Sequence, residues 1–383
     1  MTSGLKELSE MRTVTELASA DCSWLMSPGA HRGVVISSRI RLARGWTAYA
    51  FHRKLSRKRQ QELTDRLLDH LAAVVPVTGV AWQMQALSPI ERLALVERQV
   101  ISRDLSAAKR PGGVFLAESH GVSGHLLAAM VNEEDHLRLQ VIGPGLCLPH
   151  LLAAAVTVDQ GLEQRVAWAI DPQLGYLTAC HTNLGTGLRA SVMLHLPALA
   201  ETGELKAVLR ALGKLHLAVR GGHGEGTEPT GHTFQISNAR ALGATEEAFV
   251  AAIEAAVERV ISAEQIARAA MLEKARPRLE DKIFRAWGML TSARSLSTDE
   301  LGEQVSWLRL GVALDVLGDR EWVVATESPQ GATTPASLRW RALDRLAVQA
   351  QPAHLQLLNG GAELEAPDRD RLRADLVRRL LSN

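Results

Sequence analysis

The spacing of apolar residues changes near Gly243, and this change constrains the fold more than any other feature of the sequence. Before this point, short segments such as residues 137–142 alternate apolar and polar side chains, which is the period of a half-buried strand. After it, apolar residues recur every three or four positions from residue 249 to residue 261, which is the period of one helix face. We therefore expect a mixed region of strands and helices followed by a helical region.

The same reasoning places individual elements. A helix begins after Ser56 and ends at Pro76, and Ser297 with Glu300 forms a capping box for a later helix. Residues 1–33 are predicted to be a short leader, and residues 275–278 a linker between two helices. Strands are expected at residues 34–37, 137–142, 167–170, 215–219 and 233–237. The predicted class is α+β, ending in a helical domain.

Composition excludes several kinds of protein. A chain of 383 residues exceeds what one hydrophobic core usually serves, so we expect one large and one smaller domain. The 43 Lys and Arg residues nearly balance the 42 Asp and Glu residues, so we expect neither a nucleic-acid nor a membrane partner. Three cysteines without a CxxC pair indicate a reducing cytoplasm. No run of about 18 apolar residues that could span a membrane occurs.

Five arginines stand in polar or glycine-rich surroundings: Arg39 and Arg41 in SSRIRLAR, Arg138 in NEEDHLR, Arg189 in GTGLRASV and Arg220 in RGGHGEG. Arg39 and Arg41 lie two residues apart after a strand and therefore point to one face. Arginines that share a face need an anion, and a polyphosphate suits the planar guanidinium, which binds pairs of oxygens. No Walker pattern occurs, so a P-loop enzyme is excluded. For any single arginine, a salt-bridged surface residue is the simpler interpretation.

Two glutamates complement the arginines, Glu134 in NEEDH and Glu225 in HGEG. A guanidinium is fully protonated near neutral pH and is a poor nucleophile. Two carboxylates could hold its planar fork in line with a phosphate while one of them accepts a proton. Residues 133–135 could also be no more than an acidic turn, which would be the preferred interpretation if NEEDH stood alone.

In combination these strings resemble the guanidino (phosphagen) kinase superfamily, and most closely its bacterial protein arginine kinase branch. The resemblance rests on SSRIRLAR, NEEDHLR, the CxTNLGTGLRASV segment from Cys180 to Val192, and RGxxGEGxE. It implies ATP-dependent phosphorylation of arginine side chains in proteins. It also implies a catalytic domain at residues 34–267, built on an antiparallel sheet flanked by helices, and a helical C-terminal domain at residues 268–383.

The resemblance assigns roles to individual residues. Glu134 and Glu225 would bind and activate the acceptor guanidinium, and Cys180 would lie beside it with a lowered thiol pKa, although a buried apolar thiol is an alternative for Cys180. Magnesium would be held by nucleotide oxygens and water, without a dedicated protein site. ATP would be bound by Ser37, Ser38, Arg39, Ile40, Arg41, Gln99, Arg138, Arg189, Ala190, Ser191, Val192, Met193, Arg220, Gly221, Gly222, His223, Gly224 and Glu225.

Three features favour protein arginine over a free guanidino compound as acceptor. Only 36 residues precede Ser37, whereas small-molecule kinases place a helical domain there that helps to enclose the acceptor. Met193 stands where those kinases usually have histidine. The C-terminal tail resembles that of the protein kinase branch and contains its phosphoarginine-binding RDxxRA motif, here Arg369, Asp370, Arg373 and Ala374. A charged amphipathic helix is the alternative for this tail.

The chain departs from the branch at three positions: Gln99 and His223 replace a usual histidine and tyrosine, and His181 replaces a proline after Cys180. The resemblance further implies a homodimer, an activator protein and a Clp-type protease as partners, and a cytoplasmic location. Two other functions stay open at this point. One is a small-guanidine kinase, and the other is a phosphoarginine-binding adaptor without kinase activity.

Overall fold

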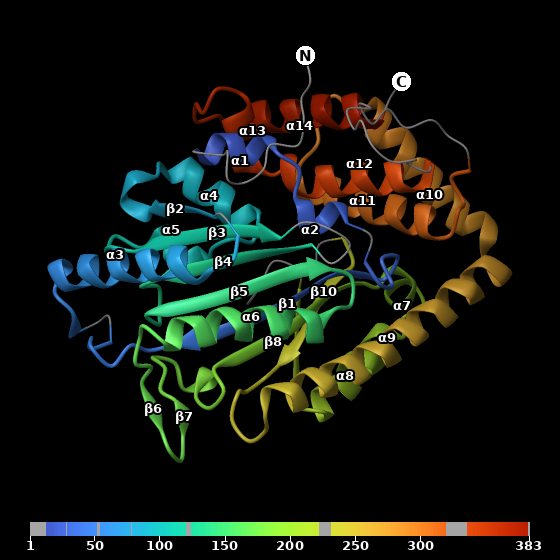
Figure 1. Ribbon diagram of the computed structural model, residues 1–383. Coiled ribbons are helices and arrows are strands. Elements are labelled where there is room, and N and C mark those ends of the chain that lie inside the picture. Colours follow the sequence, from blue (N-terminus) through green and yellow to red (C-terminus); the bar gives the residue numbers. More distant parts are fainter. Residues whose placement is uncertain are drawn as a thin grey trace.

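The computed structural model describes residues 13–27, 29–51, 54–77, 79–119, 124–221, 231–318 and 335–381. At its centre lies an eight-stranded antiparallel sheet in the order β2-β3-β4-β5-β1-β8-β10-β9 (Figure 1). Its strands are β1 Val35–Arg44, β2 Gly79–Gln83, β3 Gly113–Ser119, β4 His125–Val131, β5 Leu137–Pro144, β8 Leu188–His195, β9 Leu217–Gly221 and β10 Thr233–Asn238. A small hairpin of β6 Ile170–Asp171 and β7 Gly175–Tyr176 lies outside the sheet.

One face of the sheet is buried under long helices, and the other face is covered only in part. Helices α3 Arg57–Val74, α6 Leu148–Glu163 and α9 Glu246–Lys274 pack on the first face and form the larger core with it. Helices α4 Pro89–Glu97 and α5 Arg103–Ala107, with the N-terminal α1 Val14–Ser19 and α2 Ser23–Met26, form a second core over β3, β4 and β5 on the other face. The second face of β1, β8 and β10 is the part that the described helices of this core leave open.

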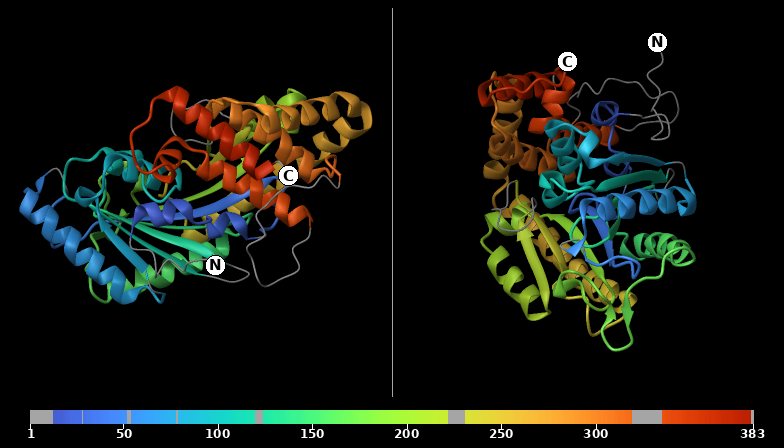
Figure 2. Two further views of the ribbon diagram at one scale, coloured as in Figure 1. Left: turned by 90° about the horizontal axis from the view of Figure 1, so that it is seen from above. Right: turned by 90° about the vertical axis from the view of Figure 1, so that its left-hand side faces the viewer.

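The remaining helices are α7 Pro197–Glu201, α8 Leu205–Lys214, α10 Arg276–Ser292, α11 Thr298–Ala313, α12 Pro335–Gln349, α13 Pro352–Leu358 and α14 Ala366–Leu381. Helices α10 to α14 form a C-terminal helical region, which is stacked at one end of the molecule in Figure 2 (orange to red). This region contributes to both cores, because Leu346 packs in the larger one and Ala353 in the other. The α+β class, the antiparallel sheet flanked by helices and the helical C-terminal region are confirmed.

Helix starts follow the capping signals of the sequence. Ser56 accepts a hydrogen bond from the Arg59 amide and begins α3, and Ser297 with Glu300 forms the complete capping box of α11. The predicted linker at residues 275–278 is wrong, because Ala275 alone separates α9 from α10. Pro277 lies in the first turn of α10, where its missing amide hydrogen costs no helical hydrogen bond.

Three of the predicted strands needed correction. The first runs over Val35–Arg44 instead of residues 34–37, because buried Ile40 and Leu42 continue its alternation past the polar residues. Residues 215–219 give a strand that starts only at Leu217, and in 167–170 only Trp168 forms an isolated bridge before the short β6 begins. In the part of the chain that is described, no helix is long and apolar enough to cross a membrane.

Candidate active site

The strand register places the predicted arginines on one face of the sheet. Directly opposed residues of an antiparallel pair point to the same side, and Arg41 of β1 is directly opposite Arg189 of β8. Arg138 of β5 is opposite Ala43, two residues along β1 from Arg41, and Arg39 lies two residues the other way. All four guanidinium groups therefore leave the sheet on the face that the helices of the larger core do not cover.

Arg220 joins this face from the edge strand. It pairs with Gln235 of β10, which pairs with Met193 of β8, which in turn pairs with Ser37 of β1. The neighbouring residues of the predicted nucleotide set alternate to the other side: the side chains of Ser38, Ile40, Ala190 and Val192 are fully buried and face the larger core. Only their backbone could contact a ligand on the arginine face.

Positive charge on this face is concentrated and poorly compensated. Burial, with the neighbouring Arg189 and Arg138, lowers the pKa of Arg39 to about 10. Burial, with Arg39 and the same neighbours, lowers the pKa of Arg41 well below its usual range. The Nε atoms of Arg39 and Arg41 are buried without a hydrogen-bond partner, and neither side chain forms an ion pair with a described carboxylate. Such a cluster destabilises the ligand-free protein and favours the binding of an anion.

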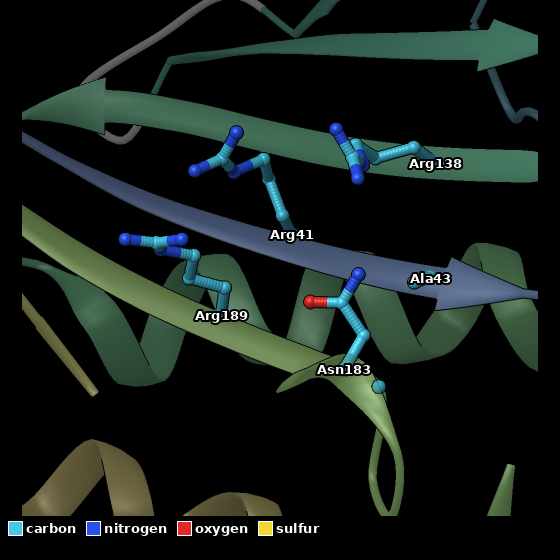
Figure 3. A pocket seen from close by; sticks show the side chains of 6 residues that line it. Arg41, Ala43, Arg138, Asn183 and Arg189 are labelled. Carbon is cyan, nitrogen blue, oxygen red and sulfur yellow. The ribbon is translucent and has the colours of Figure 1, made fainter. Parts of the chain in front are cut away.

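A small pocket opens among these side chains, lined by Arg41, Ala43, Arg138, Asn183, Gly187 and Arg189. Figure 3 shows Arg41, Arg138 and Arg189 reaching it from three adjacent strands, with Asn183 beside them. Gly187 forms part of the wall with φ of 68°, and a Cβ there would lie 2.5 Å from the Ala43 carbonyl oxygen. Only glycine fits this position, so the GTG segment can pass close to β1.

Arg44 holds the glycine-rich segment 185–187 in place, a role that the sequence did not reveal. Its buried guanidinium donates to Asp159 Oδ2 from Nη2 at 2.6 Å and from Nε at 2.9 Å, and to Oδ1 from Nε at 3.2 Å. Its Nη1 donates to the Thr186 carbonyl oxygen at 2.9 Å. It also lies over the Tyr176 ring, 3.5 Å from the ring centroid. The only sequence signal was its position as the third arginine of SSRIRLAR.

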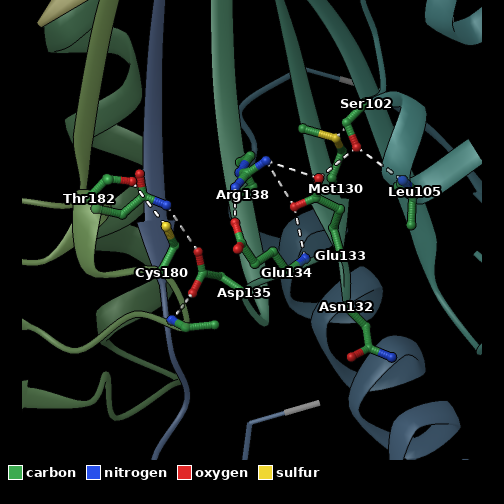
Figure 4. Close-up of polar contacts among 12 residues, drawn as sticks. Ser102, Leu105, Met130, Asn132, Glu133, Glu134, Asp135, Arg138, Cys180 and Thr182 are labelled. Atoms are coloured by element: carbon green, nitrogen blue, oxygen red, sulfur yellow. Dashed lines mark hydrogen bonds and ion pairs between the residues drawn. The ribbon is translucent and has the colours of Figure 1, made fainter. Parts of the chain in front are cut away.

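The acidic turn between β4 and β5, residues 133–135, carries Glu134, the carboxylate predicted to bind the acceptor guanidinium. Glu133 is fully buried and accepts hydrogen bonds from the Ser102 hydroxyl, the Glu134 amide and Arg138. The Glu134 side chain is 45 % exposed, and its carboxylate accepts a hydrogen bond from Arg138 Nη2 at 3.0 Å (Figure 4). The acidic turn and the arginine cluster are therefore in direct contact through Arg138, which bridges the two glutamates.

Asp135 connects this turn to the Cys180 loop. Its carboxylate accepts from the Ala179 amide at 2.6 Å and from Asn183 Nδ2 at 3.5 Å, and burial raises the pKa of Asp135 to about 6. Cys180 Sγ lies 3.0 Å from the hydroxyl of Thr182 and is only half buried. The buried apolar thiol is thus not what the structure contains, and Cys180 lies close to the acidic turn in Figure 4.

Other predicted residues lie elsewhere. Gly222, His223, Gly224 and Glu225 fall outside the described residues, whereas Gly221 ends β9. Gln99 follows α4 with φ of 61°, and its carbonyl accepts a hydrogen bond from Gln140 of the arginine face at 2.6 Å.

The described residues contain no group of three or more His, Cys, Asp or Glu side chains placed to hold a metal ion.

The predicted phosphoarginine-binding residues lie on α14, in the C-terminal helical region. Arg373 is 1 % exposed and donates to the carbonyl oxygens of Ala350 at 2.9 Å and Leu296 at 2.7 Å, and it also pairs with Asp370. Ala374 is buried, and Arg369 donates to the Leu364 carbonyl. In this arrangement Arg373 ties α14 to the loop before α11 and to the end of α12.

Comparison with known protein families gives two matches. The model described as "ATP:guanido phosphotransferase, C-terminal catalytic domain" matches residues 65–267. The model described as "Protein-arginine kinase McsB C-terminal domain" matches residues 276–328 and 334–383. Together the two matches cover the strands from β2 to β10 and the C-terminal helical region, whereas β1 lies before the first match.

Several curated proteins resemble the chain over nearly its whole length. A protein-arginine kinase of Symbiobacterium thermophilum is 41 % identical, over 96 % of this chain and 99 % of the relative. Those of Desulforamulus reducens and Geobacillus stearothermophilus are 39 % and 37 % identical, over 94 % and 95 % of this chain and 95 % and 94 % of the relatives.

Solved structures of guanidino kinases share the fold. A crystal structure of lombricine kinase superposes with a TM-score of 0.53 at 24 % identity, over 66 % of this chain and 71 % of that one. The duplicated taurocyamine kinase of Schistosoma mansoni, with bound transition-state analogue components, gives 0.55 at 22 % identity, over 77 % of this chain and 44 % of that one.

Proposed function

This chain belongs to the protein-arginine kinases of the ATP:guanido phosphotransferase family, and we propose that its arginine-lined sheet face binds ATP. Its activity is the ATP-dependent phosphorylation of arginine side chains in proteins. The observation that carries the site is the convergence of Arg41, Arg138 and Arg189 on one pocket from three adjacent strands. Guanidinium groups so arranged can bind several phosphate oxygens at once.

Most of the remaining residues predicted to bind the nucleotide lie on, or present their backbone to, the same face of the sheet. Arg39 and Arg220 extend the positive surface beyond the pocket, and Ser37, Ser191 and Met193 lie between them on that face. Backbone groups of Ser38, Ile40, Ala190 and Val192, and the glycine-rich residues 221–225, complete the proposed site. Magnesium would enter with the nucleotide, held by phosphate oxygens and water, and would neutralise part of the phosphate charge.

We assign the acceptor side of the reaction to the acidic turn. Glu134 is exposed enough to meet a protein side chain and is adjacent to Arg138. In the proposed step it takes a proton from the acceptor guanidinium, whose nitrogen then bonds to the γ-phosphorus while the bond from that phosphorus to the bridging oxygen breaks and ADP leaves. Glu225 is proposed as the second carboxylate from its sequence motif. Cys180 is proposed to border the acceptor on the other side.

The chain's own residues contribute mainly position and charge. The arginines hold the phosphates and offset the charge that spreads over their oxygens, which is how phosphoryl transfer through a loose transition state is usually catalysed. Asp135 keeps the Cys180 loop against the acidic turn through the Ala179 amide. Arg44 keeps the glycine-rich segment against β1 through the Thr186 carbonyl.

The wider partners are proposals that rest on the family. They are an activator protein, a Clp-type protease that receives the marked proteins, a second copy of the chain in a homodimer, and a phosphoarginine bound near Arg369, Asp370, Arg373 and Ala374. A cytoplasmic location is proposed from the three cysteines, which are all free.

The test uses the full chain with ATP, magnesium and an arginine-rich protein, followed by mass spectrometry under conditions that preserve the acid-labile phosphoramidate bond. We expect phosphoarginine with the wild type and a loss of at least about 1,000-fold with Glu134→Gln, because the proton acceptor is removed. Glu134→Gln should still bind ATP in a titration. Glu273→Gln, exposed on α9, serves as the matched control.

Near-normal phosphorylation by Glu134→Gln would show that the acceptor site has been assigned wrongly. A wild-type protein that leaves the substrate unmodified would indicate the binding adaptor instead. Faster phosphorylation of free arginine than of protein arginine would indicate a small-guanidine kinase. The three outcomes separate site, reaction and acceptor.

A further inference from the structure

Ser102 lies between α4 and α5 and contacts the acidic turn from outside the proposed site. Its hydroxyl donates to Glu133 Oε1 at 2.6 Å, the shortest of the hydrogen bonds that this buried carboxylate accepts (Figure 4). We propose that Ser102 is a positioning residue for phosphoryl transfer, acting through Glu133 on both Arg138 and Glu134. The proposal rests on the active site described under the proposed function.

Glu133 is suited to transmit such an effect, because it contacts both sides of the reaction. One contact is to Arg138 Nη1 at 2.9 Å, and Arg138 lines the pocket for the phosphates. Another is from the Glu134 backbone amide at 2.8 Å. This hydrogen bond holds the backbone from which the exposed Glu134 side chain extends. Glu133 is itself 0 % exposed, so water cannot replace a donor that it loses.

The direction of the Ser102 hydroxyl is fixed by a second hydrogen bond. Ser102 Oγ accepts from the Leu105 amide at 3.0 Å and so forms the N-cap of α5. With the oxygen accepting from α5, its single proton is available for Glu133. A freely rotating hydroxyl could not hold a carboxylate in one orientation, whereas this one is held from the helix side.

The segment that carries Ser102 is anchored along its length. Gln140, on the arginine face, donates to the carbonyl oxygens of Gln99 at 2.6 Å and Val100 at 3.1 Å. Glu97, at the end of α4, accepts from the amides of Ala353 and His354 at 2.8 Å and 3.0 Å. These hydrogen bonds hold the segment that precedes Ser102 between the C-terminal helical region and the sheet.

Neighbouring contacts hold only the backbone of the turn. Arg110 donates to the carbonyl oxygens of Asn132 and Glu133, and Asn132 donates to the Pro111 carbonyl. These bonds fix where the turn lies but not the rotamer of the Glu133 side chain. Ser102 and Arg138 are the side chains that orient its carboxylate, and of the two only Ser102 lies outside the proposed site.

The experiment compares Ser102→Ala with Ser102→Thr in steady-state phosphorylation of a protein substrate. We expect kcat of Ser102→Ala to fall about 10-fold or more, because a buried hydrogen bond to a charged group is lost, while KM for ATP changes much less. Ser102→Thr keeps the hydroxyl and should restore kcat to within about 3-fold of the wild type. One ATP bound per chain in a titration will show that each variant is folded.

Ser56→Ala is the matched control, since Ser56 caps α3 in the same way but takes part in none of the hydrogen bonds that the Glu133 carboxylate accepts. Its kcat should be unchanged. If Ser102→Ala does not fold, Ser102→Cys replaces it, because a thiol is a weak donor of similar size and should also lower kcat. Unchanged kcat in the folded variant, or failure of Thr to restore it, overturns the proposal.

The result can be separated from a failure of the site itself. An inactive Glu134→Gln with a fully active Ser102→Ala would leave the active site intact and reject only the positioning role. An active Glu134→Gln would reject the site on which the positioning role depends. A larger rise in KM for ATP than fall in kcat would show that Ser102 supports ground-state binding, and this too contradicts the proposal.

Discussion

Arg41 is expected to destabilise the nucleotide-free protein and to stabilise the protein with a bound anion. It is buried beside Arg39, Arg138 and Arg189, and this environment lowers its pKa well below the usual range. The charged form is therefore disfavoured in the folded chain relative to the unfolded one. Only a bound anion reverses this balance.

We accordingly expect Arg41→Met to raise the free energy of unfolding of the nucleotide-free protein by about 1–2 kcal/mol. The same substitution should weaken ATP binding at least about 10-fold, because one guanidinium of the proposed phosphate site is lost. Urea unfolding and an ATP titration measure the two effects. Arg276→Met, at an arginine with a 64 % exposed side chain on α10, should change neither by much. A less stable nucleotide-free Arg41→Met would show that the cluster is neutralised within the protein.

At the residue scale, the sequence revealed the arginines that face the pocket but not the residues behind them. Arg39 and Arg41 could be placed on one face because strand alternation is local. Arg44 and Ser102 act through Asp159 and Glu133, which lie far away in the sequence, so no local pattern reveals them. Arg44 also contradicts the expectation that arginine is exposed, since it is 1 % exposed.

At the scale of elements, capping signals were reliable and strand ends were not. Ser56 and Ser297 began helices as predicted, because a cap needs only residues three positions apart. The strand predicted at residues 34–37 extends to Arg44 in the structure, because Ile40 and Leu42 continue the buried side while Arg39 and Arg41 lie on the other side. The linker at 275–278 failed because Pro277 can begin a helix as well as interrupt one.

Glu97 connects two elements that belong to different regions of the chain. It ends α4, and its carboxylate accepts from the first amides of α13, those of Ala353 and His354, and contacts His354 Nδ1 at 2.7 Å. A carboxylate at a helix N-terminus satisfies amides that have no partner within the helix and interacts favourably with their partial positive charge.

We expect Glu97→Gln to lower the free energy of unfolding by about 1–2 kcal/mol, because the amide group can satisfy only some of these donors and carries no charge. Hydrogen exchange should become faster at the amides of α13 before it does so in β1. The control is Glu280→Gln, whose partner Arg276 is an exposed neighbour on the same helix and whose loss should cost less than about 0.5 kcal/mol. Unchanged exchange in α13 would contradict the capping role.

At the scale of the whole molecule, the two regions matched by separate family models share their cores. The larger core joins residues of the sheet with Leu279, Leu343 and Val377 of the helical region. The second core joins the N-terminal helices and α4 with Ala353 and Leu357 of α13. The partly buried ion pair of Asp21 with Arg345, at 2.6 Å, adds a polar link between the N-terminal segment and α12. Contacts of this extent are expected to make the regions unfold together.

Calorimetry can test this cooperativity through a substitution in the helical region alone. Leu346 of α12 is fully buried in the larger core, so Leu346→Ala should cost about 2–4 kcal/mol. We expect a single unfolding transition in the wild type, and in Leu346→Ala the same single transition at a lower temperature, also when followed at the sheet. Leu358→Ala, at a leucine 44 % exposed, should leave it in place. Two transitions, of which only one responds to Leu346→Ala, would mean that the shared cores do not couple the regions, and the positions of Glu97 and Ser102 would then be set by the sheet alone.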